Sequence, residues 1–208
     1  MSVNRTIFGL RTKQDYLIYE AAHPSFKEAL EDAVGININL TGVDLSGKDL
    51  QHINLDGINL SNADFRNSNL TGANISEARL ENCDFSGAAL FETCFCYSDL
   101  SNCNFEDGRF GLTDFSQCGL SDSVFSLFSA HTIPFRQAIV ETRNFFRHEG
   151  RNMEFNAAPL TLTGLKSPVS LIGNKILIGN DLYDLAGENY RVLTELMHEF
   201  LMPPSIKH

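Results

Sequence analysis

The sequence predicts a mainly β fold in which residues 36–127 wind as a four-sided parallel β-helix, with a helical segment before it and an α+β segment after it. Three observations predict this fold. An apolar residue recurs at every fifth position from Leu40 to Phe125. A small residue usually lies two positions before each of these centres, and polar residues or glycine follow it. After Ser126 the pattern ends and the composition changes.

The five-residue period is the main evidence for the coil. All the centres are leucine, isoleucine or phenylalanine. A period of five fits neither the 3.6-residue turn of an α-helix nor the two-residue alternation of a strand. It fits a chain that turns a corner every five residues, with the centre and the small residue before it pointing inward. Four corners close a coil of about twenty residues, and successive coils pair like parallel strands about 4.8 Å apart, giving about 4.5 coils.

If a coil holds about twenty residues, residues n and n+20 stack on one another. The phenylalanine centres then form columns, where offset ring stacking adds to the burial of apolar surface. Lys48 stands at an inward small position, where a charge is unfavourable, so we expect its side chain to extend outward. We expect the conspicuous centres to be structural core and not a ligand pocket: Leu40, Leu60, Phe65, Leu80, Phe85, Phe95, Leu100, Phe105, Phe115 and Phe125.

The repeat unit is a small residue, then Asp or Asn, then Leu or Phe, then two polar residues, as in the run that begins at Ala63. It closely resembles the pentapeptide-repeat family, over about 90 of the 208 residues. The resemblance implies a right-handed quadrilateral β-helix. It implies little about function, because the family performs many tasks. Family members that confer quinolone resistance resemble duplex DNA in width and charge and bind DNA gyrase or topoisomerase IV. Those proteins have longer rods and dimerise end to end through their C-termini.

Residues 1–35 are expected to form an N-terminal helical cap, because the open end of a coil stack needs to be covered. Residues 12–34 resemble two short helices. The signals are a break at Pro24, an N-cap at Thr12 with Asp15, a capping box from Ser25 to Glu28, and a stop at Gly35.

Residues 128–208 are expected to form a C-terminal α+β cap or a small subdomain, and a homodimer contact is the alternative. The segment 134–150 resembles an amphipathic helix. The segment 169–183 resembles short strands joined by turns at Gly173-Asn174 and Gly179-Asn180. The segment 189–202 resembles a closing helix that ends before Pro203.

No motif predicts catalysis, a cofactor or a metal. The sequence has no phosphate-binding loop, no G-x-G-x-x-G after a strand and no G-x-S-x-G turn. His198-Glu199 lacks the final histidine of H-E-x-x-H, and His131 and His148 occur without a motif. Cys94-Phe95-Cys96 has no second cysteine pair, so we expect no metal there. We therefore predict a protein that is not an enzyme and needs no cofactor.

The cysteines and the apolar runs indicate a compartment. The five cysteines form an odd set without a secretory signal, which is typical of reduced thiols in a bacterial cytoplasm. No apolar run reaches the roughly 18 residues of a membrane span. We therefore expect a cytoplasmic protein without membrane contact, and secretion as an effector is the alternative.

The net charge of −10 lies almost entirely in the coil. Residues 36–130 contain 13 acids and 4 bases, a net charge of −9. Direct binding to nucleic acid is then unfavourable, and a protein partner with a basic surface is favoured. The candidate contact residues are the outward acids Asp44, Asp64, Asp84, Glu106 and Asp107, followed by the bases Arg136, Arg143 and Arg147.

Four interpretations of the function remain open from the sequence. The first is a protein–protein interaction module that presents an acidic coil surface to a macromolecular partner. The second is a DNA mimic that binds or protects DNA gyrase or topoisomerase. The third is a translocated bacterial effector. The fourth, the least favoured, is an enzyme whose site lies in residues 131–208.

Overall fold

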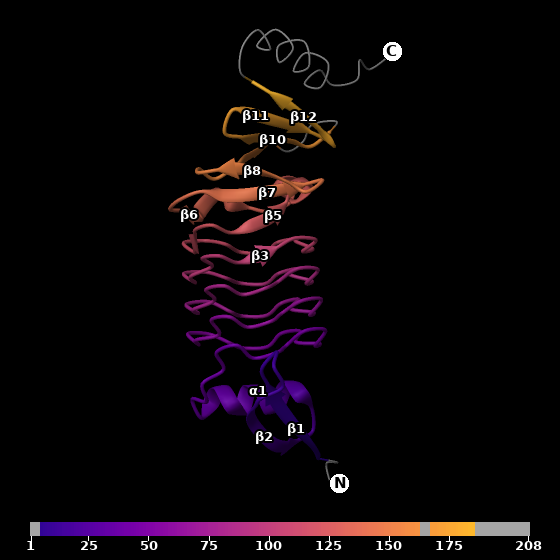
Figure 1. Ribbon diagram of the computed structural model, residues 1–208, viewed down its shortest axis with the longest axis vertical. Coiled ribbons are helices and arrows are strands. Elements are labelled where there is room, and N and C mark those ends of the chain that lie inside the picture. The colour runs from indigo at the N-terminus through magenta and orange to yellow at the C-terminus, as the bar shows by residue number, and fades with distance from the viewer. Residues whose placement is uncertain (1–4, 163–166, 186–208) are drawn as a thin grey trace, which may run out of the picture.

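The computed structural model describes residues 5–162 and 167–185 and is mainly β (Figure 1). A stack of coils lies between a strand pair with one helix at the N-terminal end and a four-stranded sheet toward the C-terminal end. Among the described residues, no helix has the length and apolar character that a membrane crossing requires.

Residues n and n+20 pair in parallel along the coil, as the five-residue period predicts. Asp44 pairs with Asp64, for example, and Asp64 in turn pairs with Asp84. Each pairing is held by backbone hydrogen bonds, such as Leu70 N to Ala89 O at 2.8 Å. Three further series of the same kind give the coil four sides; the four series begin at Asp44, Asp49, Asn54 and Asn59. The short strands β3 (Asn104–Phe105), β4 (Gly119–Leu120) and β5 (Val124–Ser126) continue these series.

Each corner is a tight turn that contains a residue in the left-handed conformation. The amide of Ala63 donates to the carbonyl of the centre Leu60 at 2.9 Å. The residue two positions after a centre has a positive φ, such as 66° at Asn62 and 67° at Gly57. Glycine and asparagine adopt this conformation at the least free-energy cost. This explains why polar residues and glycine follow the centres.

Every centre from Leu40 to Phe125 is buried, so the predicted core is confirmed. The rings of Phe65, Phe85, Phe105 and Phe125 stack in one column, with centroids 4.8–5.0 Å apart and interplanar angles of 4–7°. Stacking therefore adds to apolar burial on this side from Phe65 to Phe125.

The inward small positions also satisfy their polar groups. The hydroxyl of Ser98 donates to Ile75 O at 2.6 Å, and the thiol of Cys103 donates to Leu80 O at 3.0 Å in the same geometry. Lys48 is the exception that the sequence indicated. Its side chain is exposed, and its ammonium lies 4.7 Å from the centre of the Phe26 ring.

The N-terminal segment contains one helix and not two. Strands β1 (Thr6–Arg11) and β2 (Leu17–His23) form an antiparallel pair, so the predicted helix before Pro24 is wrong. The amide of Asp44 donates to Arg11 O at 2.7 Å and so joins the strand pair to the first coil. Pairing of this kind between distant segments overrides the helical spacing of residues 12–23. Helix α1 (Phe26–Gly35) is confirmed, with the Ser25 hydroxyl accepting from the amide of Glu28.

Parallel pairing continues beyond residue 127. Two 3₁₀ helices, η1 (Leu127–His131) and η2 (Phe135–Gln137), lead into β6 (Ile139–Val140), which pairs with β4. Strand β7 (Asn144–His148) pairs in parallel with β5, and β8 (Arg151–Phe155) pairs antiparallel with β7.

The predicted helix over 134–150 is therefore wrong. The ring of Phe135 stacks on that of Phe115, with 6.2 Å between the ring centroids. Phe146 is buried, and its ring centroid lies 6.1 Å from that of Phe125. Burying these rings on the end of the coil outweighs the weak helical spacing of the segment.

The predicted strands over 169–183 are confirmed. Strands β9 (Leu160–Leu162), β10 (Val169–Ile172), β11 (Lys175–Ile178) and β12 (Asp181–Asp184) form an antiparallel sheet in the order β12-β11-β10-β9. Gly173 and Gly179 have positive φ in the turns between these strands. The predicted helix over 189–202 lies outside the described residues.

Candidate functional site

The repeat fixes which side chains reach the outer surface. In each unit the residue before the centre and the two residues after it point away from the buried core. The residue before the centre is usually Asp or Asn, and its side-chain oxygen accepts from the amide two positions on, as in Asp84 to Ser86 N at 3.0 Å. The outer side chains therefore have fixed positions along each side of the coil.

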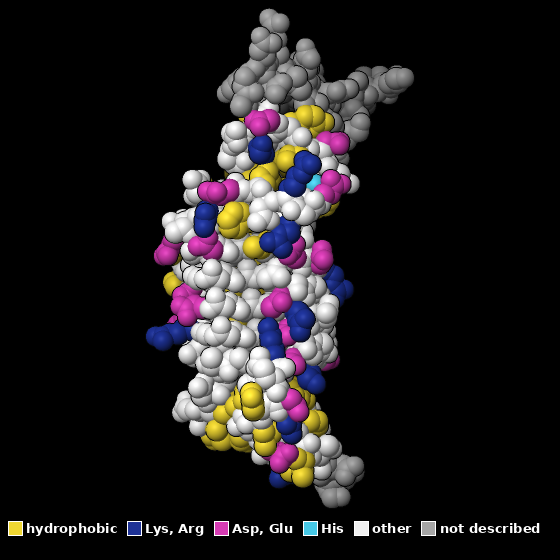
Figure 2. Space-filling model, viewed as in Figure 1, with side chains coloured by type: hydrophobic (Ala, Val, Ile, Leu, Met, Phe, Trp, Pro, Cys, Tyr) yellow, Lys and Arg dark blue, Asp and Glu magenta, His cyan; other side chains and the backbone are white. Residues whose placement is uncertain are grey.

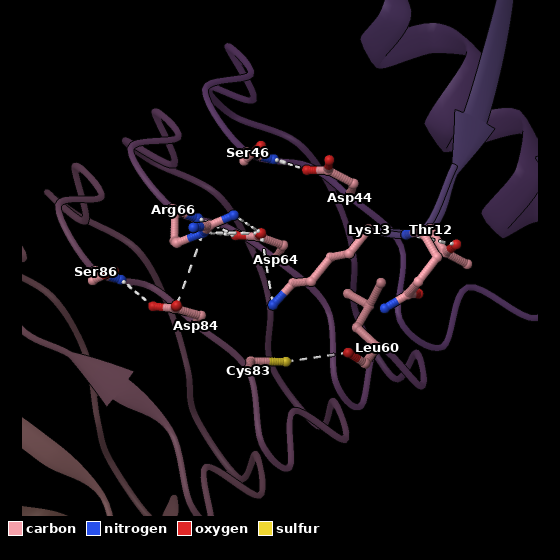
Figure 3. A network of polar contacts seen from close by, with 11 residues as sticks. Thr12, Lys13, Asp44, Ser46, Leu60, Asp64, Arg66, Cys83, Asp84 and Ser86 are labelled. Carbon is pink, nitrogen blue, oxygen red and sulfur yellow. Dashed lines mark hydrogen bonds and ion pairs between the residues drawn. The ribbon is translucent and has the colours of Figure 1, made fainter. Parts of the chain in front are cut away.

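The predicted acidic stripe exists as a column, but Asp64 is not exposed. Its side chain is fully covered, with Arg66 at 2.6 Å and Lys13 at 3.6 Å (Figure 3). Burial raises the pKa of this carboxyl, but hydrogen bonds from Arg66 and the charge of Lys13 outweigh that effect and hold the pKa below its usual value. The expectation that Asp64 faces solvent is wrong, because Lys13 reaches it from the segment between β1 and β2.

Two further acids of the predicted stripe, Asp84 and Glu106, lie close to positive charge, whereas Asp44 and Asp107 form no ion pair with a described residue. Arg66 lies 3.9 Å from Asp84, and Arg147 of β7 lies 2.6 Å from Glu106. Asp107 remains exposed and accepts from the hydroxyl of Ser126 at 3.3 Å. Acidic and basic side chains intersperse on the face shown in Figure 2, without a continuous acidic surface.

The three candidate arginines do not share a helix face. Arg136 lies in η2, Arg143 directly precedes β7, and Arg147 lies within β7. The Arg143 guanidinium pairs with Asp122 at 3.0 Å and lies 5.8 Å from the centre of the Phe145 ring. Both Arg143 and Arg147 therefore neutralise acids of the coil, and their role in partner binding stays a prediction.

A different side of the coil carries acids that form no ion pair among the described residues. We call this side the acidic face; it consists of residues 54–57, 74–77, 94–97 and 114–117. It contains Asp56, Glu77 and Asp114, all exposed, and its sequence has no lysine or arginine. No ion pair joins these three acids to any other described residue. Each of the other three sides contains an arginine: Arg66, Arg79 or Arg109.

The acidic face also brings two cysteines and a carboxylate together. The Sγ atoms of Cys94 and Cys96 are 2.8 Å apart, and Asp114 pairs with Cys94 in the next coil. Burial, the neighbouring Cys94 thiol and the Asp114 carboxylate raise the pKa of Cys96 well above its usual value. Asp114 follows Cys94 by 20 positions, which is one coil. The twenty-residue period alone therefore places Cys94, Cys96 and Asp114 on neighbouring coils of the same side.

The other three cysteines are structural. Cys83, Cys103 and Cys118 occupy inward small positions and are buried. Burial raises the pKa of Cys83 and of Cys118 to about 12. Thiols of this kind react slowly, because the thiolate is the reactive species.

His131 has a structural contact instead of a catalytic one. Its Nδ1 lies 2.9 Å from the Ser170 hydroxyl of β10, and its Nε2 lies 2.8 Å from Gly179 O. Ser170 is fully buried, so a substrate cannot reach its hydroxyl. The hollow beside these residues, about 440 Å³, is lined mostly by apolar side chains of the η1–η2 region and β9. His131 therefore links the sheet to the end of the coil.

Comparison with known proteins identifies the repeat family of the coil. A family model described as pentapeptide repeats matches residues 49–87 and 83–122, with eight copies. No curated protein sequence is similar enough to match this chain.

Solved structures with similar chains include HetL, a pentapeptide repeat protein involved in heterocyst differentiation regulation from the cyanobacterium Nostoc. It is 20% identical over 48% of this chain, which spans only 44% of HetL, with a TM-score of 0.37. A pentapeptide repeat protein of the Arabidopsis thaliana thylakoid lumen is 19% identical, over 55% of this chain and 83% of its own, with a TM-score of 0.28. QnrB1, a plasmid-mediated fluoroquinolone resistance protein, is 25% identical over 38% of this chain and 51% of its own, with a TM-score of 0.20. These likenesses carry no argument about function.

Proposed function

Since this chain belongs to the pentapeptide-repeat family, we propose that it acts as a protein-binding module and not as an enzyme. The acidic face is the docking surface in this proposal. The observation that carries it is the set of three exposed acids, Asp56, Glu77 and Asp114, which have no ion pair with any described residue. The partner is a protein with a basic surface.

Charge and rigidity both support this assignment. Unpaired exposed carboxylates attract a basic partner and increase its rate of association. The hydrogen bonds and stacked rings of the coil hold these carboxylates at fixed spacings, so little conformational entropy is lost on docking. Tyr97, which lies on the same face and is exposed, offers an aromatic side chain of the type enriched at interfaces.

The finer architecture belongs to the same proposal. In it, residues 36–127 form a right-handed quadrilateral β-helix of about 4.5 coils and residues 1–35 cap its N-terminal end. Residues 128–208 are its C-terminal extension, in which β6 and β7 continue the parallel pairing. The four series of n to n+20 bridges support the four sides. Leu10, Leu30 and Ala33 support the cap, because they are buried in one cluster with the first coils.

A DNA mimic that binds a topoisomerase is less well supported by the contacts. Mimicry of DNA requires a regular line of unpaired negative charge. The most regular column, Asp44 to Asp84, is partly neutralised by Arg66 and Lys13. A supercoiling assay with purified DNA gyrase separates the two functions: inhibition or protection of gyrase would favour the mimic.

The test compares two variants with the same change in charge. Asp56→Asn with Glu77→Gln neutralises the acidic face. Asp49→Asn with Glu92→Gln neutralises two exposed acids on another side of the coil. The two variants are matched, because Glu77 and Glu92 both occupy corner positions with a positive φ. Quantitative affinity capture from a native cell extract should give a protein that the wild type and the second variant retain. Its retention by the first variant should fall at least about tenfold. Equal retention by both variants, or no retained protein, would contradict the proposal.

A further inference from the structure

Cys94 and Cys96 do not have the structural role of the other cysteines. They lie before and after the buried centre Phe95, at outward positions, and both are partly exposed. The inward thiols fill small buried sites, and those of Cys83 and Cys103 donate to Leu60 O and Leu80 O of the preceding coil. Core packing therefore explains those cysteines and leaves this pair unexplained.

The pair also replaces a contact that the repeat uses on both sides of it. In the coil before, the Asn74 side-chain oxygen accepts from Ser76 N at 3.2 Å. In the coil after, Asp114 accepts from Ser116 N at 2.8 Å. A cysteine offers no comparable acceptor at the position of Cys94, so the local turn is less well satisfied there. The Cys-Phe-Cys unit thus lacks a contact that the units before and after it in the same column make.

The coil then places a carboxylate beside the two sulfurs. Asp114 is paired with Cys94 as residue n+20, and one ligand atom from each of the three residues lies within 4.8 Å of the others. Among the described residues, this is the only group of three His, Cys, Asp or Glu side chains with such spacing. Residues 54–57, 74–77, 94–97 and 114–117 include no lysine or arginine, and no ion pair of Asp114 occurs among the described side chains.

We propose that Cys94, Cys96 and Asp114 form a binding site for a thiophilic divalent cation of the zinc class. Zinc binds thiolate sulfur at about 2.3 Å and carboxylate oxygen at about 2.0–2.2 Å, usually in a tetrahedron. Three protein ligands leave the fourth position for water or a group from a partner. Binding releases the thiol protons, because thiolates are the ligands, and the cation offsets the negative charge of the three groups. Two sulfur ligands select against magnesium and calcium, which prefer oxygen.

The site shares Asp114 with the proposed docking surface. Metal binding does not require docking, so a separate measurement tests it. The reduced full-length protein is titrated with cobalt(II), which reports thiolate coordination through a ligand-to-metal charge-transfer absorption band. Zinc is then added to displace the cobalt. We expect one cobalt per chain, a charge-transfer band, and loss of that band on addition of zinc.

The variants are chosen so that each one folds. Cys94→Asn with Cys96→Ser recreates the Asn and Ser that stand at positions 74 and 76, and it should abolish the band. Asp114→Asn keeps the turn acceptor and should keep the band but weaken affinity at least about tenfold. Cys103→Ser is the matched control, because Ser98 makes the same inward contact, and it should bind cobalt like the wild type.

Several results would overturn the site. These are a wild type without the band, a band that survives in Cys94→Asn/Cys96→Ser, and a band that disappears in Cys103→Ser. Reduced protein that forms a Cys94–Cys96 disulfide on exposure to air and takes up no cobalt would assign the pair to redox chemistry instead. Asp56→Asn with Glu77→Gln should leave cobalt binding unchanged, so failure of the docking proposal and failure of the metal site can be told apart.

Discussion

At Gly57, a corner residue two positions after a centre, backbone conformation and not space limits which side chain can be present. Gly57 has a φ of 67°, and a Cβ added there would meet no atom within 4 Å. Gly119 has the same free space without a positive φ. We expect Gly57→Ala to lower the free energy of unfolding by about 1–2 kcal/mol. Gly119→Ala should leave it unchanged or raise it by up to about 1 kcal/mol.

Chemical denaturation monitored by circular dichroism measures both variants under the same conditions. Equal losses of stability for Gly57→Ala and Gly119→Ala would show that the corner does not require the left-handed conformation.

The buried carboxylate of Asp64 makes stability depend on pH in the acid range. Its pKa is lowered in the folded protein, because contacts with Arg66 and Lys13 outweigh the effect of burial. A lowered folded pKa means that the ionised form stabilises the fold fully above the unfolded pKa of about 3.9. This contribution is lost as the pH falls through the folded value. We expect Asp64→Asn to be less stable than the wild type at pH 7 and to lose less stability between about pH 4 and pH 2.

Urea denaturation at several pH values measures this difference. If the free energies of unfolding of the wild type and Asp64→Asn fall in parallel below pH 4, the ion pairs at Asp64 do not stabilise the folded protein.

At the scale of the elements, the phenylalanine column is the part of the core with the most specific packing. Phe105 stacks on Phe85 at 5.0 Å and on Phe125 at 4.9 Å, both with interplanar angles of 4°. Leucine fills the same position in other units, so Phe105→Leu keeps a hydrophobic centre but loses both stacking contacts. We expect a loss of about 1–3 kcal/mol in the free energy of unfolding.

Phe91 provides the control for this substitution. It lies at an outward position and is 39% exposed. Phe91→Leu should change the free energy of unfolding by less than about 0.5 kcal/mol. A thermal or chemical unfolding series that shows similar losses for both substitutions would contradict a stabilising role for the column.

At the scale of the whole molecule, the coil could be predicted from the sequence and its two ends could not. Every fifth residue from Leu40 to Phe125 is apolar and buried. The same five-residue unit occurs in every coil, so the conformation that each unit favours locally is also the one that stacking of the coils favours. The segments 12–23 and 134–150 occur once. Their structure depends on pairing with the end coils, which overrides a helical spacing that no repetition supports.

The candidate contact residues were predictable in part for a similar reason. The Asp44–Asp64–Asp84 column follows from the twenty-residue period and is present. The covering of Asp64 by Lys13 is a contact across 51 positions that the period does not describe. The acidic face, by contrast, follows from the period alone, because Asp56, Glu77 and Asp114 belong to one side that carries no base.

The central claim is that the chain advances one coil every twenty residues, with each fifth side chain inside. Backbone hydrogen bonds test it most directly, because the amide of each centre donates to the carbonyl 19 positions ahead: Leu55 to Asn74, Phe65 to Asp84 and Leu70 to Ala89. Scalar couplings across hydrogen bonds, measured by NMR on deuterated protein, identify donor and acceptor residue by residue. We predict couplings at this constant spacing from Leu45 to Leu100. Couplings to carbonyls four positions back, or at spacings that change from coil to coil, would contradict the account.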